Sequence, residues 1–89
     1  MLHNYRKIDP IKAEQFDGSL EMMEKYHITY DGYSIFGETY TFRLDRNALP
    51  LERGWWIVYL GTSKVFGLTL VNWVMMSDEK FHQIYERCD

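Results

Sequence analysis

The sequence predicts an α+β fold: a twisted antiparallel sheet of about five strands with two short helices. Three patterns support this prediction. Residues 39–45 alternate between apolar and polar side chains, as in an antiparallel strand with one solvated face. Residues 55–60 are apolar on both faces, which is typical of a central strand covered on two sides or at an interface. Residues 20–26 and 78–86 space their apolar side chains as short amphipathic helices do.

The first strand and the first helix are expected before residue 27. Residues 8–16 read as an extended strand, and Pro10 confines that strand to a sheet edge or marks its start. Gly18 and Ser19 then open the helix at 20–26, with Ser19 as its N-cap. A helix this short is marginal on its own, so it should pack on the sheet.

Turn signals divide the middle of the chain into strands. The dipeptide Asp31-Gly32 is typical of tight hairpins, so we expect a turn there, and Gly37 should turn the chain again. The strand that follows, residues 39–45, directs its apolar side chains to one face. These side chains are Tyr40, Phe42 and Leu44, and the opposite face carries Thr39, Thr41, Arg43 and Asp45.

The last third of the chain reads as a second hairpin followed by a helix. Residues 61–64 look like a hairpin turn between the strand at 55–60 and a long apolar strand at 65–76, which should pair with it. Ser77 is the expected N-cap of a helix over roughly 78–86. Acidic side chains in its first turn face the positive end of the helix dipole.

Composition favours one domain over residues 1–89 that associates with other chains. The chain is 46% hydrophobic and 17% aromatic. A chain this short has difficulty burying every ring, so a ligand pocket or a subunit interface should cover some of them. We therefore expect a homo-oligomer.

The charge of the chain limits the classes of partner it can bind, and its cysteine content indicates the cellular compartment. The net charge is −3, from 10 basic and 13 acidic residues that are scattered along the chain, and this argues against binding of duplex nucleic acid. No apolar run approaches the roughly 20 residues of a membrane span or resembles a secretion signal, so no membrane association is expected. The single cysteine, Cys88, suits a reducing cytoplasm.

Neither a metal site nor a catalytic site is expected from the spacing of reactive side chains. The histidines His3, His27 and His82 stand apart, and no second cysteine accompanies Cys88, so we expect no metal and no cofactor. Glu14 and Asp17 could be imagined as an acid and base pair, but Asp17 reads as a turn residue. A phosphodiesterase whose catalytic residues are scattered along the sequence stays an alternative.

Aromatic and cationic side chains in the second half favour recognition instead. Neighbouring residues of a strand point to opposite faces, so Trp55 and Trp56 cannot both fill one core, and one of them should face outward or across an interface. An exposed indole could stack on a base or on a partner's apolar side chain, while arginines bond phosphate oxygens. Plain packing and solvated arginines are the competing interpretations. The candidate ligand-binding residues are Trp55, Trp56, Trp73, Tyr59, Arg43, Arg46 and Arg53.

Three segments of the chain carry a family resemblance. Residues 6–18 read RKIDPIKAEQFDG, residues 54–58 read GWWIV, and residues 81–86 read FHQIYE. Together they resemble small accessory proteins of bacteriophages and prophages, which begin with a basic pair, a proline and an Ile-Glu-Ala-like strand and end in Phe-x-x-x-Tyr-Glu. That family usually has Asp after the glycine of the middle segment. Trp55 takes its place here, which suggests a re-purposed surface or a different oligomeric contact.

The resemblance implies expression in the host cytoplasm, where small phage proteins commonly disarm host defence. Our first hypothesis is a non-catalytic, oligomeric sponge that captures a small nucleotide-type immune signal. The second is an inhibitor or adaptor that binds a host defence protein through an exposed aromatic patch, and the third is a phosphodiesterase-like enzyme. A concave site would favour capture, whereas a flat or convex aromatic patch would favour docking on a protein.

Overall fold

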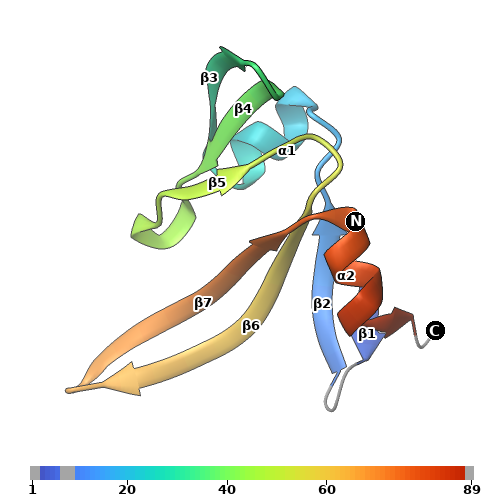
Figure 1. Cartoon of the computed structure of the whole chain (residues 1–89). Coiled ribbons are helices and arrows are strands. Elements are labelled where there is room, and N and C mark those ends of the chain that lie inside the picture. Colours follow the sequence, from blue (N-terminus) through green and yellow to red (C-terminus); the bar gives the residue numbers. More distant parts are fainter. Residues whose placement is uncertain (1–2, 7–9, 88–89) are drawn as a thin grey trace.

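The computed structural model describes residues 3–6 and 10–87, and the side chains of residues 12–85. It confirms the α+β class (Figure 1). In chain order the elements are β1 (His3–Arg6), β2 (Pro10–Gln15), α1 (Leu20–Lys25), β3 (Ile28–Ser34), β4 (Gly37–Phe42), the short 3-10 turn η1 (Leu44–Arg46), β5 (Leu49–Leu51), β6 (Trp56–Val65), β7 (Leu68–Met76), α2 (Asp78–Ile84) and β8 (Glu86–Arg87). Residues 8 and 9 of the predicted first strand, and Cys88, lie outside this part of the chain.

The strands divide between two antiparallel sheets, so the prediction of a single sheet is wrong. One sheet has the order β7-β6-β2-β1-β8, and the other has the order β3-β4-β5. The second sheet and α1 lie, in sequence, between β2 and β6, which pair with each other in register Glu14↔Ile57. The local pattern of a strand does not record which distant strand it pairs with, and this long-range pairing separates the two sheets.

Strand β6 is central, as its apolar character predicted. It pairs with β2 on one edge and with β7 on the other. Ile57 and Val58 are both fully buried, although consecutive strand residues point to opposite faces. Both faces of β6 are therefore covered, each by a different part of the molecule.

Both helices begin where the sequence predicted. The Ser19 hydroxyl accepts a hydrogen bond from the Met22 backbone N–H at 3.2 Å, and the Ser77 hydroxyl accepts one from the Lys80 N–H at 3.2 Å. These bonds satisfy N–H groups that have no partner inside the first helical turn. Gly18, just before the first cap, has φ +81°, a left-handed conformation that favours glycine.

The two predicted hairpin turns lie elsewhere, and this is the main local correction. Strand β3 continues through Asp31-Gly32, where the pairing register shifts in a β-bulge, and the hairpin turn lies between Ser34 and Gly37, which confirms the turn expected at Gly37. Likewise β6 continues past Gly61, again at a register shift, as far as Val65. A glycine with positive φ suits a bulge as well as a turn, so the dipeptide signal alone does not separate them.

The alternating strand is shorter than predicted but buries the expected face. Tyr40 and Phe42 are buried and Leu44 is half-buried, whereas Arg43 and Asp45 are exposed. Strand β4 ends at Phe42, and the chain then enters η1. Backbone pairing thus stops before residue 45, while the apolar residues keep to one face.

Two apolar clusters lie on opposite sides of β6, since Ile57 belongs to one and its neighbours Trp56 and Val58 belong to the other. The first is enclosed by α1 and the β3-β4-β5 sheet. Its buried members are Phe16, Met22, Tyr26, Ile28, Tyr40, Phe42, Leu51 and Ile57. The second lies under α2, and its buried members are Ala13, Trp56, Val58, Met76, Phe81 and Tyr85.

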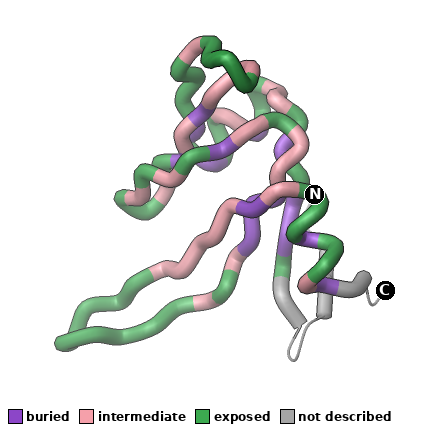
Figure 2. The backbone as a smooth tube through the Cα atoms, in the orientation of Figure 1, coloured by how far each residue is buried: buried purple, intermediate pink, exposed green. Residues whose placement is uncertain are grey.

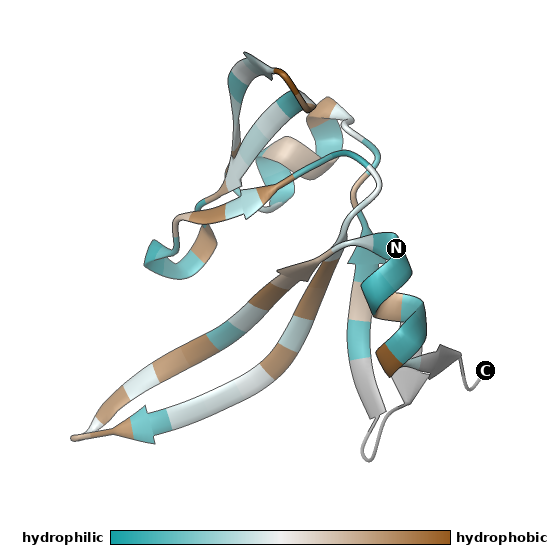
Figure 3. Cartoon of the chain, viewed as in Figure 1, coloured by the Kyte–Doolittle hydropathy of each residue, from teal (hydrophilic) through white to brown (hydrophobic). Residues whose placement is uncertain are grey.

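The distal half of the β6–β7 hairpin projects from the body of the molecule (Figure 1). We call residues 60–70 the arm. All of them are exposed except Gly61, which is half-buried (Figure 2). Several apolar residues nevertheless follow one another along it (Figure 3). The arm is thus a regular two-stranded ladder outside both clusters.

Candidate functional site

The two adjacent tryptophans point into different clusters, and neither ring is fully exposed. Contact of one of them across an interface stays a prediction. Trp56 is 7% exposed and stacks on Phe81, with ring centroids 4.1 Å apart and an angle of 5° between the planes. Its indole N–H donates to Asp78 Oδ1 at 2.8 Å. Trp55 is half-buried against the first cluster. The prediction that the two rings cannot share one core is confirmed.

Trp73 and Tyr59 belong to an aromatic group at the edge of the first cluster. The Trp73 ring lies 5.1 Å from Tyr59, 5.3 Å from Phe42 and 5.8 Å from Tyr26. The Trp73 indole N–H donates to Asp45 Oδ2 at 2.8 Å. This bond ties β7 to η1, and both rings are half-buried.

The three predicted arginines lie at different places. Arg43 Nε donates to Thr29 Oγ1 at 3.1 Å on the outer face of the second sheet. Arg53 forms an ion pair with Glu38 at 2.9 Å. Of the three, Arg46 alone lines the large cleft described below. The structure therefore does not bring the candidate arginines and indoles together around one cavity, and their role in ligand binding stays a prediction.

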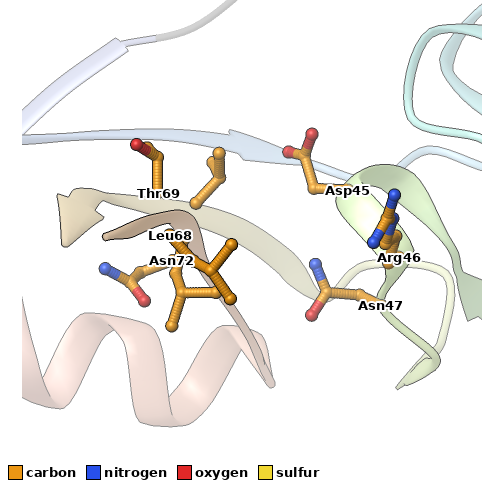
Figure 4. A pocket seen from close by; sticks show the side chains of 8 residues that line it. Asp45, Arg46, Asn47, Leu68, Thr69 and Asn72 are labelled. Atoms are coloured by element: carbon orange, nitrogen blue, oxygen red, sulfur yellow. The ribbon is translucent and has the colours of Figure 1, made fainter. Parts of the chain in front are cut away.

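A cleft of about 630 Å³ lies between η1 and the free edge of β7 (Figure 4). It is lined by Asp45, Arg46, Asn47, Leu68, Thr69, Leu70, Val71 and Asn72. Asp45 and Arg46 have φ values of +56° and +65°, a conformation that is uncommon for residues other than glycine. Backbone of this kind often occurs at functional sites, because the surrounding contacts must hold it in place.

Glu14 forms a buried polar group that the sequence did not single out as structural. Its carboxylate accepts hydrogen bonds from Tyr26 Oη at 2.6 Å and from Lys25 Nζ at 3.1 Å. Burial alone would raise the pKa of Glu14, but the hydrogen bonds to its charged form outweigh burial and lower the pKa to about 2. Burial and the bond to Glu14 both raise the pKa of Tyr26. Near neutral pH the Glu14 carboxylate is therefore charged and the Tyr26 hydroxyl keeps its proton, so this pair stabilises the fold and does not exchange protons.

The imagined acid and base pair of Glu14 and Asp17 is not formed as such. Asp17 Oδ1 accepts a hydrogen bond from the Ser19 N–H at 2.8 Å, and this bonding to Ser19 lowers the pKa of Asp17. Asp17 is thus a turn residue, as the sequence indicated. Across the described side chains, no three His, Cys, Asp or Glu residues lie close enough together to hold a metal ion.

The most exposed apolar side chains outside the arm lie at the end of the β3–β4 hairpin. We call Tyr33, Ile35 and Phe36 the tip. Ile35 is 92% exposed, Phe36 is 82% exposed, and both occupy the two-residue loop between Ser34 and Gly37. A recess of about 290 Å³ beside them is lined by Phe36, Glu38, Glu52 and Arg53. The tip is exposed at the end of a hairpin, and the residues around it are polar.

The tip is held in place by its polar neighbours. Glu38 accepts hydrogen bonds from Tyr33 Oη at 3.3 Å, from Tyr40 Oη at 3.0 Å and from Arg53 at 2.9 Å. The Ser34 hydroxyl accepts a bond from the Phe36 N–H at 3.1 Å. Tyr40 belongs to the first cluster, so these bonds connect the exposed loop to the core.

Comparison of the chain with protein-family models, with curated proteins and with solved structures finds no match. The resemblance to phage accessory proteins accordingly stays a prediction. Within the part of the chain that the structure covers, neither helix is long and apolar enough to cross a membrane.

Proposed function

We propose that this protein is a non-catalytic binding protein that docks on a partner protein through the tip. The observation that carries the proposal is the position of Ile35 and Phe36, two large apolar side chains exposed to solvent on the loop of a hairpin. Exposed apolar side chains of this size, surrounded by polar groups, are characteristic of the centre of a protein interface.

The preorganisation of the tip supports the proposal. Because Glu38 bonds to Tyr33, Tyr40 and Arg53, the loop does not have to become ordered when a partner binds. Less conformational entropy is then lost on association, so more of the contact energy contributes to affinity. Among Glu38, Glu52 and Arg53 the acidic side chains are in excess. The matching partner surface is an apolar pocket with basic residues at its rim.

The resemblance to phage proteins suggests the class of partner. Under this proposal the partner is a host defence protein, and the small protein acts as an inhibitor or adaptor in the host cytoplasm. Such activity depends on occupancy and needs no turnover. It also agrees with the roles of the titratable side chains described above, which cap turns and brace the core.

A second candidate function is capture of a small nucleotide-type anion in the cleft. The cleft volume falls in the range of about 300–1,000 Å³ that is typical of ligand sites, and Arg46 provides one cation for a phosphate. We rank capture second because the residues that line the cleft include no aromatic ring to stack on a base. Asp45 also adds a negative charge there.

A photo-crosslinking experiment tests docking through the tip. p-Benzoylphenylalanine replaces Ile35 in one variant and Leu20 in a control, because Leu20 is similarly exposed, at 77%, on α1. We expect a discrete covalent adduct with one protein in living bacterial cells from the Ile35 position only. A Phe36→Ser change in the same chain should weaken that adduct. Equal labelling from both positions, or no discrete adduct, would contradict docking through the tip.

A panel of cyclic and linear nucleotides separates the remaining functions. We expect no shift in the unfolding temperature with any member of the panel. Stabilisation without consumption that is lost in Arg46→Gln would establish capture, and consumption of the nucleotide would establish catalysis.

A further inference from the structure

The apolar side chains of the arm gather on one face of its two strands. Val74 and Met76 of β7 face the second cluster under α2, and the period of two along a strand places Leu68 and Leu70 on the same face. The register pairs Leu68 with Val65. On β6 the register shift between Tyr59 and Gly61 interrupts the alternation, so that Ser63 and Val65 lie opposite Leu70 and Leu68 on this face. Leu60 is the extra residue of this bulge, and together with Gly61 it lies opposite Asn72.

We define the arm patch as Leu60, Val65, Phe66, Leu68 and Leu70, in which Phe66 occupies the hairpin turn. Phe66 is 100% exposed, Leu68 is 67% exposed, and the other three are close to half exposed. The patch continues the face that α2 covers nearer the body, where Trp56 stacks on Phe81. Helix α2 therefore covers one half of an apolar sheet face, whereas the other half is exposed in the described part of the chain. Two of its residues, Leu68 and Leu70, also line the cleft beside η1.

The polar groups on this face favour burial. Lys64 pairs with Thr69, and by alternation both lie on the opposite face, so the patch itself carries no charge. Its polar side chains are Ser63 and Asn72, and they bond to each other, with Asn72 Nδ2 donating to Ser63 Oγ at 3.3 Å. Burial of this face leaves fewer polar groups without partners than burial of an ordinary surface would.

We infer that the arm patch binds the arm patch of a second copy of this chain, in a two-fold symmetric dimer. An uncharged apolar surface is complementary to itself, which a two-fold interface requires. The net charge of −3 would otherwise make two copies repel each other, and the arm patch is a surface that brings none of that charge into contact.

The area of the patch is sufficient for a stable dimer. From their exposed fractions, the five side chains present on the order of 400 Å² of apolar surface per copy. Two copies would bury about 800 Å² of apolar area, and since apolar area is roughly 60% of a typical interface, the whole contact would be about 1,300 Å². This lies at the lower end of the range of about 1,200–2,000 Å² for specific interfaces. The dimer does not depend on the proposed docking through the tip.

The molar mass in solution tests the dimer. Sedimentation over roughly 1 to 100 μM should show a species of twice the 10.8 kDa chain mass. The Leu68→Ser/Leu70→Ser variant should dissociate at least about 100-fold more readily, because four buried leucines are lost per dimer. Leu20→Ser is the control, since this leucine is also exposed, at 77%, but lies on α1. It should leave the dimer unchanged.

A cysteine pair tests the geometry without removing the patch. In a Cys88→Ser background, a flexible bis-maleimide should cross-link two copies of Leu70→Cys, because the reagent spans a distance that a direct disulfide does not. Thr69→Cys, one residue along on the opposite face, should not be cross-linked. Circular dichroism checks that each variant is folded. A monomeric wild type at the highest concentration, a dimer that survives both leucine substitutions, or equal cross-linking from both cysteines would overturn the inference. Binding of the monomer to lipid vesicles through the patch would overturn it as well.

Discussion

The buried carboxylate of Glu14 makes acid sensitivity the most quantitative prediction from this structure. Glu14 accepts bonds from Tyr26 and Lys25, and its pKa is about 2 in the folded protein, against an ordinary value of 4.5. The folded state therefore binds fewer protons than the unfolded state between these two values. Glu14 contributes its full stabilisation above about pH 4.5, and the contribution is lost as the pH falls through 2.

The magnitude follows from the size of the shift. A difference from 4.5 to about 2 corresponds to an upper limit of roughly 3 kcal/mol in the free energy of unfolding at pH 7, shared among all the groups that interact with the carboxylate, Tyr26 and Lys25 among them. Lys25 is about half exposed, so solvent screens its share of the interaction. We therefore expect Glu14 to stabilise the folded protein by about 2 kcal/mol through this linkage.

Denaturant unfolding at a series of pH values provides the assay. Glu14→Gln removes the titration with little change in side-chain shape, so its free energy of unfolding should fall less steeply than that of the wild type between pH 4.5 and 2. Tyr26→Phe should lose about 1.5–3 kcal/mol at pH 7, because a charge-assisted hydrogen bond disappears. Glu24→Gln, on the exposed side of α1, is the control for removal of one carboxylate.

One result would refute this reasoning. If wild type and Glu14→Gln lose stability in parallel from pH 7 down to pH 2, the carboxylate of Glu14 does not titrate differently in the two states. The bond from Tyr26 would then have no role in acid stability. A parallel loss in Glu24→Gln and wild type is the expected outcome and sets the scale for comparison.

Three further predictions concern the packing. Phe81→Ala removes the ring that stacks on Trp56, and calorimetry should show that the free energy of unfolding falls by about 3–5 kcal/mol. A decrease of less than about 1 kcal/mol would contradict the packing of α2. Gly18→Ala should lower the free energy of unfolding by about 1 kcal/mol or more, because φ is +81° and a Cβ would lie 2.7 Å from Arg53 Nε. Unchanged stability in a denaturant titration would show that the turn can adjust to the new side chain. Ser77→Ala removes the N-cap of α2 and should lower the free energy of unfolding by about 1 kcal/mol. An unchanged melting temperature would argue against that cap.

Local features of the chain were predictable from the sequence because their causes are local. The N-caps at Ser19 and Ser77 depend on side chains that reach backbone groups three residues away. The buried face of β4 depends only on alternation, and Tyr40 and Phe42 lie on it as predicted. The central position of β6 followed from apolar residues on both of its faces.

The positions of the turns and the packing of the Trp55 and Trp56 rings depend on long-range contacts, which the local sequence pattern does not predict. Gly32 and Gly61 have the conformation of turn residues, yet each lies in a bulge, because the partner strand continues alongside. The α+β class and the caps were therefore determined by the sequence itself. Tertiary structure alone decided that Trp55 and Trp56 pack against different clusters, because β6 lies between two separate cores. Tertiary structure likewise decided that the exposed apolar surface lies on the tip and the arm.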